Sequence, residues 1–118
     1  MLTEDLPALP ATATMREAVV QLAERRGIVM VVDGAGRLEG ILTAGDLTRL
    51  MEHEENVFPV PVKNVMNTNP KRTTPDELAS AVVYRMEEHG IMAMPVIDDA
   101  GRIAGVVHLH DLMRAGVT

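Results

Sequence analysis

Two aspartates, Asp46 and Asp111, occur in similar short stretches that combine an apolar run with a polar turn. Residues 40–47 read Gly-Ile-Leu-Thr-Ala-Gly-Asp-Leu, and residues 105–112 read Gly-Val-Val-His-Leu-His-Asp-Leu. The glycines and the aspartates of the two copies are both 65 positions apart (105 − 40 and 111 − 46). An apolar strand followed by Thr-x-x-Asp is typical of a strand that turns into a helix. The chain therefore contains one structural unit twice, and the turn is its candidate chemical centre.

The first turn has a structural and a functional interpretation. A Thr at the N-cap and an acid at the third helical position stabilise a helix by about 1 kcal/mol, also in proteins that bind no ligand. In the functional interpretation, the free N–H groups of the helix start and the Thr43 hydroxyl bind a phosphate. The Asp46 carboxylate then accepts hydrogen bonds from ribose hydroxyls. The duplication of the turn, together with the resemblance given below, favours at least one ligand site.

The second turn differs because His108 replaces the threonine. Its imidazole, with an ordinary pKa near ~6.5, can pair with a phosphate or a sugar carboxylate when protonated. The neutral ring is either a helix cap or without a role. We therefore expect the site around Asp111 to differ from the first in ligand preference or pH dependence. His108 and His110 would share one face of a strand, but structural zinc needs four ligands and the sequence offers no obvious others, so no metal site is expected.

Composition restricts the class of protein. The 118 residues are 47% hydrophobic and 24% charged, which is typical of a globular domain. The net charge of −6 argues against a nucleic-acid-binding face. The absence of cysteine excludes disulfides and thiolate catalysis, and no apolar run approaches the roughly 18 residues of a membrane span. We expect a cytoplasmic protein that binds neither nucleic acid nor membrane.

The first unit is predicted from residues 1–56. Prolines make residues 6–10 a short edge strand or a linker end, and the Thr14-x-x-Glu17 capping box begins a helix that Gly27 ends. The apolar stripe of this helix is Met15, Ala18, Val19, Leu22 and Ala23. Residues 28–32 and 37–42 are predicted strands joined by the Asp-Gly-Ala-Gly turn. A helix follows the Thr43 turn.

Residues 57–67 are predicted to be a connector that ends in a short turn, since Pro59 and Pro61 oppose regular structure. The second unit, residues 68–118, repeats the order after a possible strand at 71–73. Thr74-Pro75-Asp76-Glu77 predicts a helix start, and the helix is expected to end at Gly90. Its apolar stripe is Leu78, Ala81, Val82 and Met86. Strands at 91–97 and 102–107 and a short helix at 112–116 complete the unit.

The copies differ in length where the helix becomes a strand. Gly27 to Asp33 spans six steps (33 − 27), whereas Gly90 to Asp98 spans eight (98 − 90). A loss of two residues preserves the inside-outside alternation of a strand, so the fold should survive, but a pocket lined there should change. One such unit cannot cover both faces of its sheet. The predicted fold is therefore α/β (α+β), with two β-α-β-β-α repeats packed in pseudo-twofold symmetry.

Three stretches together resemble a tandem pair of CBS domains, a Bateman module. They are the Gly-Ile-Leu-Thr-x-x-Asp-Leu of residues 40–47, the Met-Pro-Val-Ile-Asp-Asp-x-Gly-Arg of 94–102 and the Val-Met-x-x-x-Pro of 65–70. The stretches Asp5-Leu6-Pro7 and Met15-Arg16-Glu17-Ala18, with the ending at 108–116, look closest to the C-terminal CBS pair of bacterial arabinose-5-phosphate isomerases. The sugar-isomerase domain of that family is absent from this sequence.

The resemblance implies a regulatory module that dimerises and modulates an attached or partner sugar-phosphate isomerase. Its effector would be an adenine nucleotide or a cytidine-activated octulosonate sugar (CMP-octulosonate type), and no cofactor is required. The strand that flanks the base in CBS pockets corresponds to Ile91, Ala93 and Met94, with Val29 and Met30 as first-copy counterparts, although an ordinary core strand explains them equally well. Lys71 is a candidate phosphate partner, or else a solvated cation.

No residues resemble a nucleophile–base pair, a P-loop or a dinucleotide fingerprint, so an enzyme is not expected. Two functions from different classes remain. One is ligand sensing through Thr43, Asp46, His108 and Asp111. The other is a structural oligomerisation module that binds nothing.

Overall fold

The computed structural model describes residues 6–116, which form two compact units. The N-terminal unit comprises Pro7–Pro70, and the C-terminal unit begins at Lys71 and also includes Leu6. Asp5 and Val117, which belong to the family resemblance, lie outside the described residues. Each unit has its own sheet and its own pair of α-helices, so the mixed α/β class predicted from the repeat is confirmed.

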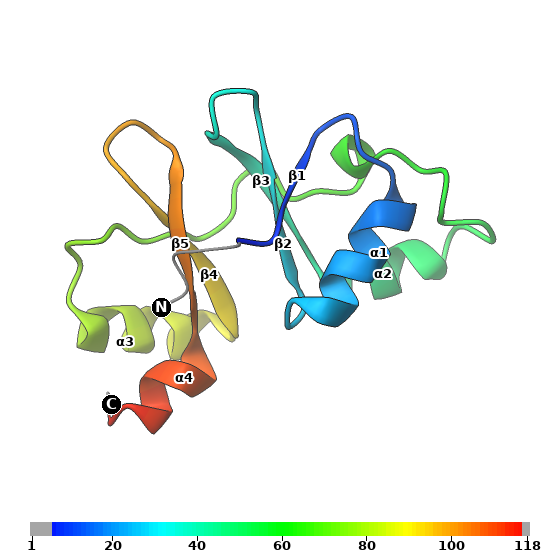
Figure 1. The fold of residues 1–118 in the computed structure, drawn as a ribbon. Helices are drawn as coiled ribbons and strands as arrows, with labels where there is room; N and C mark the ends of the chain where they lie inside the picture. Colours follow the sequence, from blue (N-terminus) through cyan, green and yellow to red (C-terminus); the bar gives the residue numbers. More distant parts are fainter. Residues whose placement is uncertain (1–5, 117–118) are drawn as a thin grey trace. The chain divides into compact units, whose positions relative to one another are not determined.

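The N-terminal unit has the predicted order β-α-β-β-α (Figure 1). Its elements are β1 (Ala8–Pro10), α1 (Met15–Glu24), β2 (Ile28–Val32), β3 (Leu38–Thr43) and α2 (Ala44–Met51). The sheet order is β1-β2-β3, with β1 parallel and β3 antiparallel to β2. The proline-containing β1 is therefore an edge strand, as its sequence predicted.

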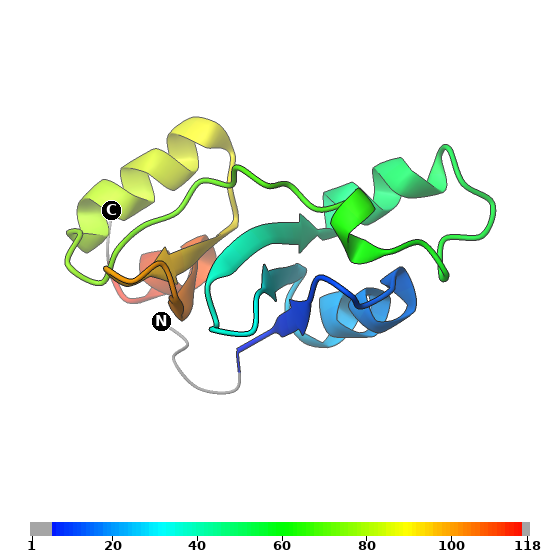
Figure 2. The same cartoon turned by 90° about the horizontal axis from the view of Figure 1, so that it is seen from above.

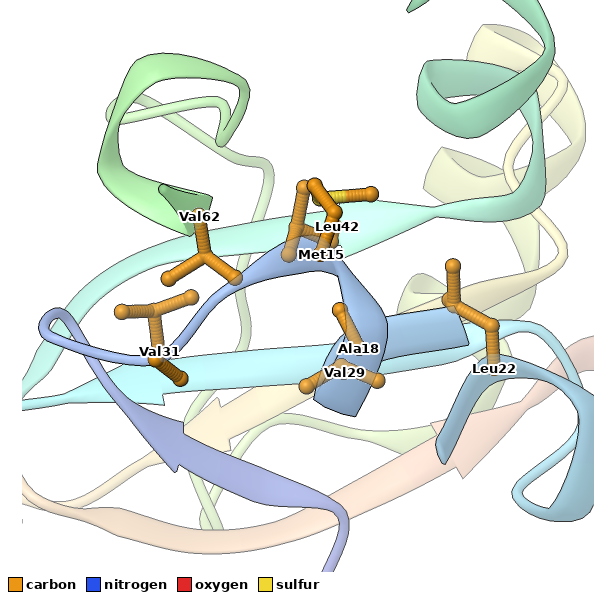
Figure 3. Packing of buried hydrophobic residues seen from close by; sticks show 8 residues of the cluster. Met15, Ala18, Leu22, Val29, Val31, Leu42 and Val62 are labelled. Carbon is orange, nitrogen blue, oxygen red and sulfur yellow. The ribbon is translucent and has the colours of Figure 1, made fainter. Parts of the chain in front are cut away.

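The core of this unit lies between α1, the sheet and the connector that follows α2. Met15, Ala18 and Leu22 point from α1 toward Val29 and Val31 of β2 and Leu42 of β3 (Figure 3). Val19 is only partly buried and Ala23 is exposed, so the stripe is narrower than predicted. The hairpin turn is held by Asp33, whose carboxylate accepts from the N–H groups of Ala35 and Arg37 at 2.8 and 3.0 Å.

Residues 57–67, predicted as a connector, are hydrogen-bonded to the N-terminal unit. The carbonyl of Val60 accepts from the N–H of Met15, and Val62 donates to Ala13, at 2.8 and 3.0 Å. A single 3-10 turn, η1 (Val62–Asn64), lies within the predicted connector, and the Val62 side chain is fully buried in the core (Figure 3). Asn67 then exchanges two backbone hydrogen bonds with Ile41 of β3.

The C-terminal unit repeats this order with a reduced first strand. Its elements are α3 (Ala79–His89), β4 (Ala93–Ile97), β5 (Ile103–His108) and α4 (Leu109–Arg114), which Figure 2 shows from above. The possible strand at 71–73 is a single parallel bridge between Thr73 and Val96. Val82, Val83 and Met86 of α3 pack on Met94, Val96 and Val107 of the β4–β5 hairpin.

The start of α3 differs from the prediction. The helix begins at Ala79 with Leu78 as its N-cap, four residues after Pro75. The Glu77 carboxylate does not cap it, because it accepts hydrogen bonds from the Thr73 hydroxyl and the Arg85 guanidinium. Leu78 and Ala81 are consequently exposed, and Val83 takes a buried place instead. At the other end of the unit, α4 begins three residues earlier than predicted.

The predicted two-residue difference between the repeats is a one-residue difference in the structure. The left-handed residue that ends the first helix is Arg26 (φ 63°), and its counterpart is Gly90 (φ 66°). The Gly27 N–H donates to the Leu22 carbonyl, and the Ile91 N–H donates to the Met86 carbonyl in the same way. Equivalent residues of the two helices are therefore 64 positions apart (86 − 22). The strands match at 65 (93 − 28). The extra residue lies in the turn before β4, so neither strand changes register.

No helix among residues 6–116 is both long and apolar enough to span a membrane.

Candidate functional site

The Thr43 turn joins the end of β3 to the start of α2. Thr43 has extended backbone angles and is the N-cap, and Asp46 is the third residue of the helix. The Asp46 Oδ2 atom accepts from the Thr43 N–H at 2.8 Å and from its hydroxyl at 3.1 Å. The Asp46 N–H approaches the same hydroxyl oxygen at 3.4 Å. The capping role predicted for this pair is therefore confirmed.

Arg49, which was not a predicted site residue, completes this turn. Its guanidinium forms an ion pair with the Oδ1 atom of Asp46 at 2.5 Å. The Arg49 side chain is 68% exposed, whereas that of Asp46 is 14% exposed. The three-residue spacing between Asp46 and Arg49 on a helix was the available signal. The turn thus combines helix N–H groups, a hydroxyl, a carboxylate and an exposed cation, which are groups that bind a phosphorylated ribose.

Strand β2 lies beside this turn. Ile28 is paired with Thr43, and the predicted site residues Val29 and Met30 follow it. Both side chains are fully buried, and Val29 belongs to the core cluster with Leu42. Val29 therefore has a structural role. Met30 points to the opposite face of the strand, because neighbouring residues alternate.

The second turn differs in geometry as well as in composition. His108 is the last residue of β5 and the N-cap of α4, but its side chain forms no cap hydrogen bond. It is 5% exposed, whereas Asp111 is partly buried in the first turn of the helix. His110 belongs to α4 and is exposed, so the two histidines do not share a strand face. Residues 6–116 contain no group of three or more side chains suited to hold a metal ion.

The other predicted residues of the C-terminal unit are only partly brought together. Ala93 pairs with His108 across the β4–β5 hairpin, and the carbonyl of Met92 accepts from the N–H that begins α4. Ile91 packs at the edge of the core, and Met94 is buried within it. Lys71 is exposed, and the described part of the chain provides it with no ion pair.

Comparison with known proteins identifies the repeat. The family model of the CBS domain matches residues 1–53 and 62–118. Arabinose 5-phosphate isomerase KdsD of Pseudomonas aeruginosa is 33% identical over 115 residues, 97% of this chain and 35% of that protein. KdsD of Yersinia pestis is 31% identical over 114 residues, which are 96% of this chain and 34% of that protein. The chain thus spans about a third of the length of these relatives.

Solved structures show the same fold. The CBS domain pair of protein MJ0100, solved with 5-methylthioadenosine and S-adenosyl-L-methionine, has a TM-score of 0.84 at 24% identity and covers 98% of this chain and 90% of its own. CBSX2 in complex with AMP has a TM-score of 0.82 at 17% identity and covers 98% of this chain and 90% of its own. Since the family model matches both repeats and nearly the whole chain, the protein belongs to the CBS domain family and is a tandem CBS pair.

Proposed function

We propose that this CBS pair is a regulatory module that binds a nucleotide or a sugar nucleotide at the Thr43 turn. The observation that carries the proposal is the arrangement of Thr43, Asp46 and Arg49 at the start of α2. The solved relatives that contain AMP or S-adenosyl-L-methionine support the ligand class. The expected effectors are adenine nucleotides and cytidine-activated sugars of the CMP-octulosonate type.

The proposed binding mode follows from the bonds of the turn. Among the first N–H groups of α2, that of Ala44 donates to Gly27 and that of Asp46 approaches the Thr43 hydroxyl, whereas that of Gly45 has no acceptor among residues 6–116. The Gly45 N–H and the Thr43 hydroxyl receive a phosphate, while Asp46 accepts from ribose hydroxyls. Arg49 occupies Oδ1 of Asp46 without ligand, and its exposed side chain turns toward the phosphate when the ribose takes that oxygen. Binding therefore replaces the ion pair between Arg49 and Asp46 by an ion pair between Arg49 and the ligand phosphate.

The second turn is proposed to bind more weakly or with a different pH dependence. His108 supplies no hydroxyl, and its ring is buried. A protonated imidazole at this position would pair with a ligand phosphate. A ligand phosphate near His108 would accordingly bind more tightly in mildly acid solution. A His108→Ala variant whose affinity has the same pH dependence as the unchanged protein would contradict this part of the proposal.

The biological role proposed for the module is modulation of a sugar-phosphate isomerase domain, attached or separate, in a cytoplasmic homodimer. The similarity to KdsD supports the isomerase partner. The regulatory mechanism would be a difference in ligand affinity between two arrangements of the module, since a ligand shifts an equilibrium only by that difference.

A thermal-shift panel of AMP, ATP, S-adenosyl-L-methionine and a cytidine monophosphate sugar tests the ligand claim. A ligand present at ~100 times its Kd should add about 2.7 kcal/mol to the unfolding free energy. The proposal predicts a saturable shift with at least one member. No shift with any of them at millimolar concentration would favour the alternative function.

The alternative is a structural oligomerisation module. It is favoured by two observations: the Asp46 carboxylate is already satisfied within the protein, and the C-terminal unit exposes large apolar side chains at Leu78, Tyr84 and Met113. Under this alternative, sedimentation would show a dimer whose stability no nucleotide changes.

A further inference from the structure

The C-terminal unit contains a pocket of about 160 Å³ that the Thr43 turn does not share. Its apolar wall is formed by Val82 of α3, Val96 of β4, Val107 of β5 and Leu112 of α4. Thr73, Thr74, Pro75, Glu77 and Ala79, from the segment that leads into α3, also line the pocket and are called its rim below. An apolar cavity of about 150 Å³ is large enough to admit benzene, so this pocket has room for a branched aliphatic side chain.

The same position is filled in the N-terminal unit. The helix offset of 64 and the strand offset of 65 make Val82, Val96 and Val107 the counterparts of Ala18, Val31 and Leu42. The fully buried side chain of Val62 belongs to the same core cluster as these three residues and lies beside Val31 (Figure 3). The 65-residue spacing places no counterpart of Val62 within residues 1–118, since 62 − 65 is negative and 62 + 65 exceeds 118.

The backbone around the two positions also corresponds. In the N-terminal unit the segment that carries Val62 pairs with the start of α1, because Met15 donates to Val60 and Ala13 accepts from Val62. The counterparts in the C-terminal unit are the N–H of Ala79 and the carbonyl of Glu77. Within residues 6–116, no backbone carbonyl accepts from that N–H. No backbone N–H of these residues donates to the Glu77 carbonyl either, so within residues 6–116 the rim offers one donor and one acceptor to an extended segment.

We propose that this pocket is a docking site for an extended polypeptide segment from outside residues 1–118, which inserts a valine-like side chain. The segment has the chemistry of residues 57–66: a proline-rich extended stretch, a branched aliphatic residue and then one helical turn. Its backbone accepts from Ala79 and donates to Glu77, and its side chain is enclosed by Val96, Val107 and Leu112. This site is independent of nucleotide binding at the Thr43 turn.

A synthetic peptide with the sequence of residues 57–67 tests the proposal when it is titrated into the 15N-labelled protein. We expect saturable shifts of the amides of Val82, Val107 and Leu112. A peptide with aspartate at the position of Val62 should bind at least tenfold more weakly. Saturation with shifts confined to the N-terminal unit, or no saturation at millimolar peptide, would overturn the proposal.

Two variants at Ala79, which lines the pocket, separate the effect of side-chain bulk from that of the backbone donor. Ala79→Leu places bulk in the pocket and should abolish binding. Ala79→Pro removes only the N–H donor, and proline is well tolerated at the first helical position, so binding should weaken while the melting temperature is retained. Unchanged affinity in both variants would contradict the assignment. Self-association of the protein that the peptide does not reverse would assign the pocket to a second copy instead, and displacement of the peptide by a nucleotide would assign it to a ligand.

Discussion

At the scale of single residues, Arg26 has a backbone conformation that is costly for any residue with a side chain. Its φ of 63° lies in the left-handed region, where the second repeat has Gly90. We expect Arg26→Gly to raise the free energy of unfolding by about 1 kcal/mol. Gly90→Ala should lower it by about the same amount, because a Cβ there meets no atom within 4 Å and only backbone strain remains.

Urea denaturation of both variants measures this pair of effects. The change in the free energy of unfolding should be positive for Arg26→Gly and negative for Gly90→Ala. A destabilised Arg26→Gly variant would show that contacts of the arginine side chain outweigh the backbone cost.

Glu77 makes the stability of the C-terminal unit sensitive to acid. The hydrogen bond from the Thr73 hydroxyl, and then the bond and charge of Arg85, hold the pKa of its carboxyl below the ordinary value of 4.5. The folded state thus favours the ionised form, so this stabilisation is present above the unfolded-state pKa and is lost as the pH falls through the folded-state pKa. We expect Glu77→Gln to lower stability at pH 7 and to flatten its decline below about pH 4.5.

Urea midpoints between pH 7 and pH 3 measure the effect. Part of the decline should persist in Glu77→Gln, because backbone N–H groups, first that of Arg37, lower the pKa of Asp33 as well. An Asp33→Asn variant is therefore the control. Parallel pH profiles of Glu77→Gln and the unchanged protein would contradict the role of Glu77.

At the scale of elements, Gly40 is needed where the connector crosses β3. A Cβ at this position would lie 2.8 Å from the Asn67 carbonyl oxygen and 2.9 Å from the Met66 sulfur. Gly40→Ala should therefore displace the segment that bridges to Ile41 and cost about 1–3 kcal/mol. Gly34→Ala is the matched control, because its Cβ would meet nothing within 4 Å. Amide exchange at Asn67 measures the displacement, and an unchanged rate in Gly40→Ala would contradict it.

The elements that could be predicted from the sequence are those with one dominant local signal. Residues 28–32 are a continuous apolar run and form β2 with the predicted bounds, and the Thr14 and Thr43 caps begin their helices as expected. The start of α3 could not be predicted, because Glu77 is held by Thr73 and by Arg85, which lies eight residues away. Arg26 was missed because the adjacent Gly27 is the residue that sequence patterns associate with a helix end.

At the scale of the whole molecule, the 65-residue repeat predicted two units of one α/β fold, and the three stretches that resemble CBS domains predicted the family. The repeat predicted the candidate site less completely. His108 and Thr43 have equivalent positions, but only the Thr43 side chain forms the hydrogen bonds of a cap. Arg114 is the counterpart of Arg49 (49 + 65), yet the repeat alone does not predict the ion pair between Arg49 and Asp46. Side-chain pairing therefore had to come from the structure.

The binding affinity of an Asp46→Ala variant tests the central claim most directly. Isothermal titration with the nucleotide that gives the largest thermal shift should show at least a tenfold loss of affinity in Asp46→Ala. Glu17→Ala is the matched control, because Glu17 accepts from the N-cap N–H of Thr14 at the start of α1 as Asp46 does from Thr43 at the start of α2. The affinity of Glu17→Ala for the nucleotide should be unchanged, although this variant also loses the hydrogen bond that caps its helix. Equal affinity of Asp46→Ala and Glu17→Ala would contradict a ligand site at the Thr43 turn.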